Sequence, residues 1–493
     1  MTTGTLVIDH DVRSRITLPP CDLMIDGNWQ PAISGECFKV IDPSTEAVTA
    51  HVARAGEDDI ALAVQAARRA VDEGPWSKLS GPERARLLHR LADLVERDTA
   101  VFARLDTLDM GQPVKAAPAA IAALRYFAGW ADKIDGRYVN LPDVDGHALH
   151  AYTRREPMGV IGAITPWNGP LMLGSWKIAP ALAAGCSVVL KAPEDAPLSS
   201  LHLAQLVLEA GFPPGALNVV PGFGAEAGAA LVASPGVDKI TYTGSTAVGR
   251  EVGATASRLL KYATLELGGK SPQVIFADAD IEAALPGIAR QLYVNSGQVC
   301  VAGTRILVER SAVGEVVDGL AQLFRQVKVG DPFDPSTNIG SLINRRQLDR
   351  VTGYVDQASK EGAELVTGGH RVGDSGFFLE PTLFQGSNDM VIAQEEIFGP
   401  VGVVIGFDSF DEAMAIANAT SYGLAAMVYT SDLSTAHRAA AKIKAGMIRV
   451  NGGAGVPNPS MPFGGMKGSG TGRELSYSGI EECTVEKTVS MQL

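Results

Sequence analysis

The fold is decided by residues 160–190, which read VIGAITPWNGPLMLGSWKIAPALAAGCSVVL. The apolar run 160–164 has the length of a buried strand, residues 170–184 suit a helix that ends near Gly185, and 187–190 is a second short apolar run. The alternation continues with helices expected at 199–210, 225–233 and 246–257 and strands at 217–220 and 239–243. Short apolar strands separated by helices predict a parallel, doubly wound α/β sheet, which binds ligands at the carboxyl ends of its strands.

A second alternation runs from residue 273 to about 451 and predicts a second α/β domain. Its strands are expected at 274–276, 304–308, 401–407, 426–430 and 447–450, and its helices near 311–327, 345–360, 409–419 and 433–444. Two pieces fit neither domain: an extended pair at 135–156, around the turn-rich segment 142–146, and a strand-like tail at 484–490. Exposed strands of this kind need a partner.

Length, composition and charge narrow the class of protein. The chain has 493 residues, too many for one hydrophobic core, and 46% of them are hydrophobic, so two or three domains are expected. The net charge of −13, without a dense Lys/Arg run, argues against nucleic-acid binding. We find no signal-peptide pattern and no apolar stretch long enough to span a bilayer. Five widely spaced cysteines without a Cys-x-x-Cys motif predict neither disulfides nor a metal site, so we expect a cytoplasmic enzyme.

Cys300 follows the run Asn-Ser-Gly-Gln-Val at 295–299, after a helix expected at 280–294. Gly297 should break that helix, which places the cysteine at a helix-to-loop junction where a nucleophile can meet a ligand. The alternative is a buried structural cysteine, the commoner fate of a free thiol.

Two polar residues stand near the carboxyl ends of expected strands. Asn168 follows the strand 160–164, and its amide could hold an oxyanion; beside Gly169 it suits a turn equally well, and from this segment alone the turn is favoured. Glu266 ends a strand-like run before two glycines. Because a buried carboxylate is costly, Glu266 indicates either a general base with a raised pKa or a structural ion pair.

Two glycine-containing segments are candidates for a dinucleotide site. The segment 222–228, which includes Gly224, misses the Rossmann spacing by one residue. The segment 243–249 reads Thr-Gly-Ser-Thr-Ala-Val-Gly and precedes a helix whose N-terminus offers N–H groups and a positive dipole. Ser245 could also serve only as the N-cap of that helix. We prefer the second segment.

Four further motifs, together with the run around Cys300, resemble the aldehyde dehydrogenase superfamily in order and spacing over nearly the whole chain. They are Thr-Pro-Trp-Asn at 165–168, Glu-Leu-Gly-Gly-Lys at 266–270, Glu-Glu-Ile-Phe-Gly-Pro at 395–400 and Pro-Phe-Gly-Gly at 462–465. The resemblance implies an NAD-binding domain at 1–134 and 157–266, a catalytic domain at 267–468, and an oligomerisation extension with a C-terminal tail at 135–156 and 469–493. It also implies a homotetramer or homodimer, an aldehyde substrate, and NAD as cofactor with NADP as the alternative.

The resemblance assigns roles to individual residues. Cys300 would form a thiohemiacetal and then a thioester, Asn168 would hold the oxyanion, and Glu266 would activate water, which favours a free carboxylic acid as product. Lys177 and Glu474 match a pair that relays protons around the base. The residues expected to bind the cofactor are Ile164, Thr165, Pro166, Trp167, Lys191, Glu194, Gly224, Gly244, Ser245, Gly249, Leu267, Glu396 and Phe398.

The expected substrate pocket departs from the common pattern of the family, because Gly169 stands where many relatives have a large aromatic residue. The residues expected to line it are Gly169, Leu173, Trp176, Tyr293, Val299, Val301 and Phe463, although the aromatic ones could be simply core. A wide apolar mouth predicts a medium-chain or aromatic aldehyde. Two alternatives stay open: a semialdehyde or coenzyme-A-acylating dehydrogenase, against which Glu266 weighs, and an inactive cofactor-binding or structural protein on the same fold.

Overall fold

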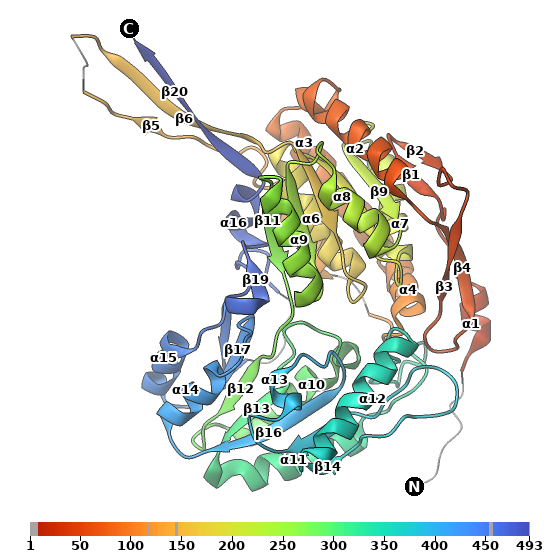
Figure 1. The fold of residues 1–493 in the computed structure, drawn as a ribbon, viewed down its shortest axis with the longest axis vertical. Coiled ribbons are helices and arrows are strands. Elements are labelled where there is room, and N and C mark those ends of the chain that lie inside the picture. Colours follow the sequence, from red (N-terminus) through yellow and green to blue (C-terminus); the bar gives the residue numbers. More distant parts are fainter. Residues whose placement is uncertain (1–7, 116–117, 143–145, 453–456, 493) are drawn as a thin grey trace.

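The computed structural model describes residues 8–115, 118–142, 146–452 and 457–492. Two α/β units lie one above the other, and a narrow antiparallel sheet projects from the upper one (Figure 1). The expected fold class, two doubly wound α/β units with a small β extension, is confirmed.

The first unit is built on an eight-stranded sheet in the order β19-β11-β10-β7-β8-β9-β1-β2. The five central strands, β7 to β11, are parallel. Strand β19 at one edge and strand β1 next to β9 are antiparallel to them, and the other edge strand, β2, pairs antiparallel with β1. The bounds are β1 Leu23–Ile25, β2 Asn28–Gln30, β7 Val160–Ile164, β8 Ser187–Ala192, β9 Leu217–Pro221, β10 Lys239–Thr243, β11 Tyr262–Glu266 and β19 Gly470–Thr471.

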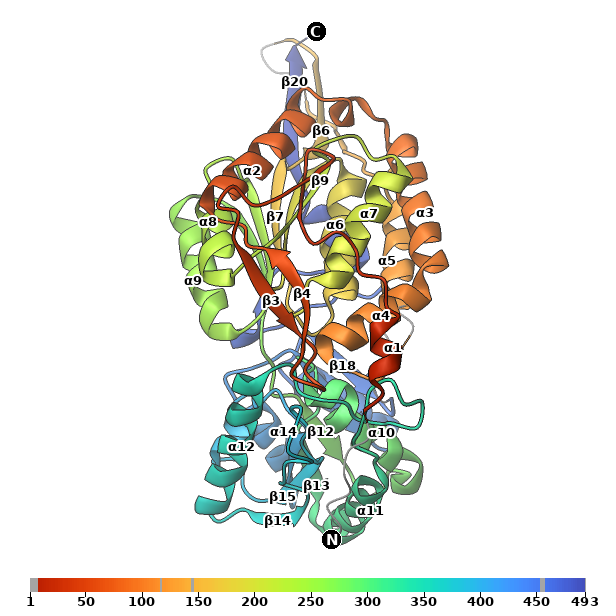
Figure 2. The same cartoon turned by 90° about the vertical axis from the view of Figure 1, so that its right-hand side faces the viewer.

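Helices cover both faces of this sheet, as the view turned by 90° shows (Figure 2). One apolar core lies under α2, α8 and α9, and a larger one lies under α6 and α7, which α3 and α5 cover in turn. The helices are α1 His10–Ser14, α2 Glu57–Asp72, η1 Trp76–Lys78, α3 Gly81–Arg97, α4 Thr99–Met110, α5 Pro118–Ala128, α6 Pro170–Ala184, α7 Leu198–Ala210, the π-helical turn η2 Gly224–Gly228, α8 Ala229–Ala233 and α9 Thr246–Arg258.

The second unit has a seven-stranded sheet in the order β14-β15-β16-β13-β12-β17-β18, parallel except for the edge strand β14. Its strands are β12 Pro272–Ile275, β13 Arg305–Glu309, β14 Glu364–Thr367, β15 Thr382–Gln385, β16 Val401–Phe407, β17 Ala425–Tyr429 and β18 Met447–Val450. Helices α10 and α11 bury one face, and α12, α13, α14 and α15 bury the other. The helices are α10 Ile281–Tyr293, η3 Val294–Gly297, η4 Arg310–Ala312, α11 Val313–Gln326, α12 Arg345–Lys360, α13 Val391–Gln394, α14 Phe410–Asn418 and α15 Leu433–Lys442.

Two small sheets complete the fold. The projecting sheet has the order β20-β6-β5, with β5 Tyr138–Val139, β6 Leu149–Pro157 and β20 Thr484–Gln492, all antiparallel. The other pairs β3 Cys37–Ile41 with β4 Val48–Ala53. The short elements η5 Lys467–Ser469 and α16 Ser476–Glu481 lie between β18 and β20. None of the helices in the described ranges has both the length and the apolar character needed to cross a membrane.

The predicted alternation agrees with the observed elements, and the differences have local causes. The bounds of β7, β10, β16, β18, α6 and α12 coincide with those expected. The helix expected at 225–233 begins as a π-helical turn, and the one expected at 280–294 ends at Tyr293 because the backbone turns left-handed there, before Gly297. The extended pair at 135–156 is confirmed as β5 and β6, and residues 143–145 of its expected turn lie outside the described residues.

Candidate active site

The loop that carries Cys300 has an unusual backbone. Asn295, Ser296 and Gly297 have φ values of 51°, 54° and 72°, so three consecutive residues are left-handed. A serine in this region costs about 1–2 kcal/mol, a strain that persists only where surrounding contacts hold it. The Ser296 hydroxyl donates to the Gly340 carbonyl at 3.1 Å, which supplies one such contact.

The side chain of Gln298 holds the same loop from two sides. Its Oε1 accepts from the Ile343 N–H at 2.9 Å, and its Nε2 donates to the Asn295 carbonyl at 3.2 Å. Gln298 is almost fully buried, whereas Cys300, two residues later, is half-buried. The loop is therefore fixed in the second unit.

Asn168 connects the first unit to this loop. Its Nδ2 donates to the Gln298 carbonyl at 2.9 Å, and Asn295 Nδ2 donates to the Asn168 carbonyl at 3.1 Å and to the Gln298 carbonyl at 3.2 Å. A side-chain amide carries two N–H donors. The bond to Gln298 therefore orients the Asn168 amide and leaves a second N–H to stabilise an oxyanion.

Glu266 is the last residue of β11 and is 3% exposed. Among the described residues neither of its carboxylate oxygens has a hydrogen-bond partner. Burial raises the pKa of Glu266 well above its usual value, and the nearby Glu474 raises it further. The positive charges of Lys177 and Arg473 lower this pKa, but by less. These are the properties of a carboxyl that can accept a proton near neutral pH.

The loop after Glu266 packs against Cys300. A Cβ added at Gly269 would collide with the Cys300 carbonyl oxygen, and the Gly269 N–H donates to Glu396 Oε1 at 3.0 Å. Burial raises the pKa of the Cys300 thiol to about 12, with smaller contributions from Glu396 and Glu266. A thiol with this pKa is protonated at neutral pH, so it needs a base before it can act as a nucleophile.

Lys177 and Glu474 form a buried ion pair beside Glu266. Lys177 lies on α6 and is 2% exposed, and its Nζ donates to Glu474 Oε1 and to Thr243 Oγ1 at 2.7 Å. Thr243 is in register with Glu266 on the adjacent strand. The two charges that sequence analysis named as a pair are therefore brought together, within electrostatic range of the candidate base.

The structure tests whether the candidate cofactor residues fit a dinucleotide. At the end of β8 and just after it, Lys191 pairs with Glu194, and the Gly224 N–H donates to Glu194 Oε1 at 3.3 Å. Although burial opposes it, the Lys191 ammonium lowers the pKa of Glu194. An ionised carboxylate beside an ammonium at the carboxyl edge of a parallel sheet fits the hydroxyl groups of a ribose.

The segment between β10 and α9 fits a pyrophosphate. A Cβ added at Gly244 would collide with the Tyr242 ring, and one added at Gly249 would collide with the side chain of Leu267. Ser245 is the N-cap of α9, with its Oγ accepting from the Val248 N–H at 3.4 Å. The cap and an anion site at the same helix end are compatible, because further N–H groups of the first turn stay unpaired.

Aromatic rings from the two units pack against each other. Trp167 and Phe398 pack edge to face with ring centroids 5.3 Å apart, and Phe398 has a left-handed φ of 61°. Burial raises the pKa of Glu396 to about 7. The Thr165 hydroxyl donates to the Lys191 carbonyl at 3.2 Å. The remaining candidates, Ile164, Pro166 and Leu267, are buried or half-buried around these groups.

The candidate pocket residues separate into two groups. Trp176 and Phe463 pack together with centroids 5.0 Å apart, in the apolar cluster that also contains Leu173 and is contacted by Cys300 and Val301. Tyr293 instead packs on the core of the second unit, 6.5 Å from the ring of Phe324, and Val299 is half-buried in the loop.

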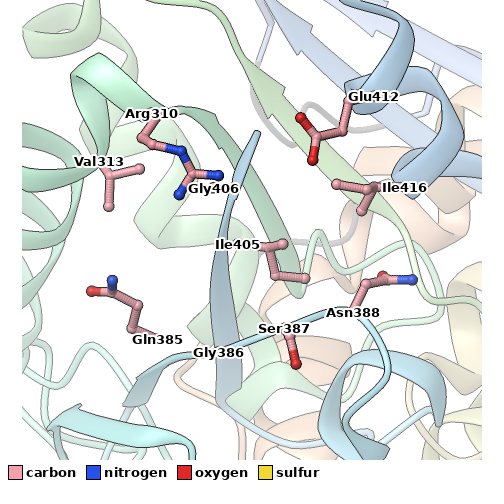
Figure 3. Close-up of a pocket in the computed structure, with 10 residues that line it drawn as sticks. All are labelled: Arg310, Val313, Gln385, Gly386, Ser387, Asn388, Ile405, Gly406, Glu412 and Ile416. Carbon is pink, nitrogen blue, oxygen red and sulfur yellow. The ribbon is translucent and has the colours of Figure 1, made fainter. Parts of the chain in front are cut away.

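A cavity of about 520 Å³ lies elsewhere, on the second unit among β16, α11 and α14 (Figure 3). Its charged side chains already have partners: Arg310 pairs with Asp408, and Glu412 accepts from the Asp408 N–H. None of the residues expected at the active site lines it.

Three residues have roles at the site that were not predicted from the sequence. Asn295 bridges Asn168 and Gln298, Arg473 acts on the pKa of Glu266, and Thr243 accepts from Lys177. Thr241 and Thr243 are alternate residues of a buried strand, and this polar alternation is the sequence pattern that could have predicted the role of Thr243. The sequence offered no comparable signal for Asn295, because its role depends on a left-handed backbone.

Comparison with known proteins gives one consistent result. The sequence pattern described as "Aldehyde dehydrogenase family" matches residues 29–489. The chain is 44% identical to "Aldehyde dehydrogenase, cytosolic 1" of Mus musculus over 96% of this chain and 95% of that protein. It is 45% identical to an aldehyde dehydrogenase of Alternaria alternata over 96% of both chains.

Solved structures agree with the sequence comparison. The NAD⁺ complex of an aldehyde dehydrogenase from Bacillus cereus is 42% identical, with a TM-score of 0.94 over 99% of this chain and 100% of that one. An indole-3-acetaldehyde dehydrogenase from P. syringae, in complex with NAD⁺ and IAA, is 40% identical, with a TM-score of 0.95 over 98% of both. The pattern of the family covers nearly the whole chain, and the chain belongs to the aldehyde dehydrogenase family.

Proposed function

We propose that the protein oxidises an aldehyde to the free carboxylic acid, with NAD⁺ as the acceptor and Cys300 as the nucleophile. The observation that carries this proposal is the buried carboxyl of Glu266, whose loop packs against Cys300. Overall, aldehyde, water and NAD⁺ give carboxylic acid, NADH and one proton.

The residues act in sequence. Once the Cys300 thiol has lost its proton to solvent, the thiolate adds to the aldehyde carbon, while the free N–H of Asn168 stabilises the oxyanion. NAD⁺, when bound, supplies the acceptor for the hydride that leaves this carbon. A thioester then remains on Cys300, and Glu266 removes a proton from the water that hydrolyses it. Glu474, whose carboxylate the Lys177 ammonium holds, accepts the proton from Glu266.

The first test is NADH absorbance with a panel of aldehydes, with and without coenzyme A. We expect NADH with at least one aldehyde and no requirement for coenzyme A. Turnover that needs coenzyme A would favour the acylating alternative, and no turnover with any aldehyde would favour an inactive protein on this fold.

The parts of the chain outside the active site also support proposals. We assign cofactor binding to 1–134 with 157–266, and catalysis to 267–468. The sheet β20-β6-β5 projects from the first unit (Figure 1), which suits assembly into a homotetramer or homodimer. Light scattering in solution tests this assembly, since a monomer would contradict it.

The five free cysteines suit a reducing, cytoplasmic location.

We expect a higher kcat/KM with NAD⁺ than with NADP⁺. The Glu194 carboxylate is ionised and can accept from ribose hydroxyls, whereas a 2′-phosphate would meet a like charge. Lys191 pairs with Glu194 and softens the repulsion, so the expected result is a preference and not an exclusion. Steady-state kinetics with both cofactors measures it, and a higher kcat/KM with NADP⁺ would contradict the assignment.

We expect hexanal and benzaldehyde to be better substrates than acetaldehyde. A Cβ built at Gly169 makes only ordinary contacts, 3.5 Å from Met172 Cε and 3.6 Å from Leu173 Cδ1, so this position leaves space beside those two side chains. Each methylene buried in such a pocket contributes about 0.8 kcal/mol, roughly fourfold in kcat/KM. Gly169→Phe should lower kcat/KM for the larger aldehydes more than for acetaldehyde.

The comparison includes succinic semialdehyde, for which the proposed pocket offers no cationic side chain. A wild-type preference for acetaldehyde or for the semialdehyde would rule out the wide apolar mouth. Equal losses for all substrates in Gly169→Phe would show that the residue acts on the fold and not on the pocket.

A further inference from the structure

One face of the strand pair β10–β11 carries a row of polar side chains. The row consists of Lys239, Thr241 and Thr243 on β10 and of Thr264 and Glu266 on β11. Thr241 is in register with Thr264, and Thr243 with Glu266. Alternate residues of a strand share a face, and the intervening residues pack into the apolar core under α9. A polar row in a buried sheet is costly unless it has a task or partners.

The inner half of the row is bonded to Lys177 and Glu474. Lys177 Nζ donates to both threonines of β10, and Thr241 Oγ1 donates to Glu474 Oε1 at 3.2 Å. Glu474 is 4% exposed, and its second oxygen has no partner among the residues that the structure describes. This oxygen is therefore free to accept a proton.

The outer half of the row ends at Glu482, between α16 and β20. Lys239 Nζ donates to Glu482 Oε2 at 2.7 Å and to the Glu482 carbonyl at 2.6 Å. Thr264 Oγ1 also donates to Glu482 Oε2, at 3.1 Å. The side chain of Glu482 is 35% exposed, whereas that of Lys239 is 2% exposed. Glu482 is thus the point at which the row meets solvent.

A small cavity with a mixed polar and apolar lining lies between the two halves. Its volume is about 20 Å³, and its lining includes Thr241, Thr264, Lys239, Glu474 and Glu482. A site needs roughly 10–15 Å³ and two to four polar partners to hold a water molecule. The cavity meets both conditions, so one water can bridge the carboxyls of Glu474 and Glu482.

We propose that Glu482 is the outer end of a proton path that runs from Glu266 through Glu474 and the cavity water to solvent. This inference rests on the proposed function. Each thioester hydrolysis moves one water proton to Glu266, and Glu266 must lose that proton before it can act again. Glu266 lies at the carboxyl end of β11, and the polar row leads from it to the opposite end of the strands, at Lys239 and Glu482. Glu482 touches neither substrate nor cofactor and acts through Glu474.

The test is Glu482→Gln in the full-length protein. Glutamine keeps an acceptor for Lys239 and Thr264 but cannot take up a proton, so the fold should be retained. We expect NADH to form at the wild-type rate in the first turnover. The thioester on Cys300 should then hydrolyse about tenfold more slowly than in the wild type. This loss is smaller than the loss of a general base, which slows a reaction roughly 100-fold or more. Rapid quenching in dilute buffer and mass spectrometry measure how much thioester remains. Imidazole, a mobile proton acceptor, should restore the rate.

Two further variants separate a proton path from a structural effect. Thr264→Val removes the hydroxyl that contacts Glu482 and should slow hydrolysis in the same way. Glu481→Gln changes the neighbouring carboxylate, which pairs with Arg155 outside the cavity, and should behave as wild type.

Wild-type hydrolysis rates in Glu482→Gln, or a slow rate that imidazole does not restore, would overturn the inference. A wild-type enzyme that makes no NADH from any aldehyde would instead overturn the proposed function.

Discussion

Cys300→Ala is expected to lower aldehyde-dependent NADH formation by roughly 10⁴-fold or more, because the covalent path begins at this thiol. The affinity for NAD⁺ should change little. Cys300 lies in a loop of the second unit, whereas Lys191, Glu194 and the segment before α9 belong to the first. NADH absorbance and calorimetric titration with NAD⁺ measure the two quantities separately.

The matched control is Cys37→Ala, which removes an exposed thiol on β3 and should leave both quantities unchanged. Substantial turnover in Cys300→Ala would rule out Cys300 as the nucleophile. A parallel loss of NAD⁺ binding would mean that the residue supports the fold of the cleft.

Glu266→Gln is expected to stop the reaction after one turnover. The variant should form about one NADH per active site and then hydrolyse its thioester roughly 10²–10⁴-fold more slowly than the wild type, because glutamine cannot remove a proton from water. Rapid mixing should show the NADH burst, and mass spectrometry of the intact protein should show the acyl group on Cys300. Hydrolysis as fast as in the wild type would mean that another residue is the base.

Glu266→Gln should also change how the rate of thioester hydrolysis depends on pH. Burial and Glu474 raise the pKa of Glu266, so the proton-accepting carboxylate forms only as the pH rises through that higher value. Wild-type thioester hydrolysis should therefore accelerate with pH across this range, and Glu266→Gln should lack that limb. The melting temperature of the variant should not fall, since a neutral amide removes the cost of burying a charge in a site without partners.

The central elements of both sheets could be predicted because they are long, apolar and regularly alternating. Sequence analysis did not name the first four strands, α4, α5, β14 or β15. Strand β1 has only three residues and pairs with β9, nearly 200 residues later in the chain, so no local period reveals it. Strand β14 has only four residues, Glu-Leu-Val-Thr, of which none is buried, so its sequence does not distinguish an edge strand from a loop.

The active site was predictable in its residues but not in its connections. Motifs with known spacing pointed to Cys300, Asn168 and Glu266. The hydrogen bond from Asn168 to Gln298 joins residues 130 positions apart, and it depends on the orientation of a main-chain carbonyl that no side-chain pattern encodes. The row of polar side chains on β10 and β11 was present in the sequence, yet its connection to Glu482 requires the C-terminal segment to return to the first sheet.

That return has a consequence for protein synthesis. Strand β11 ends at residue 266, but its edge partner β19 begins at residue 470, and β6 has to wait for β20. At ribosomal rates of about 5–20 residues per second, the open edge of the first sheet is exposed for roughly 10–40 s while the second unit is made. During that interval the edge of β11 is unpaired, and Lys177 lacks its partner Glu474. Chaperones that shield strand edges should therefore bind the nascent chain most strongly when translation lies between these two points.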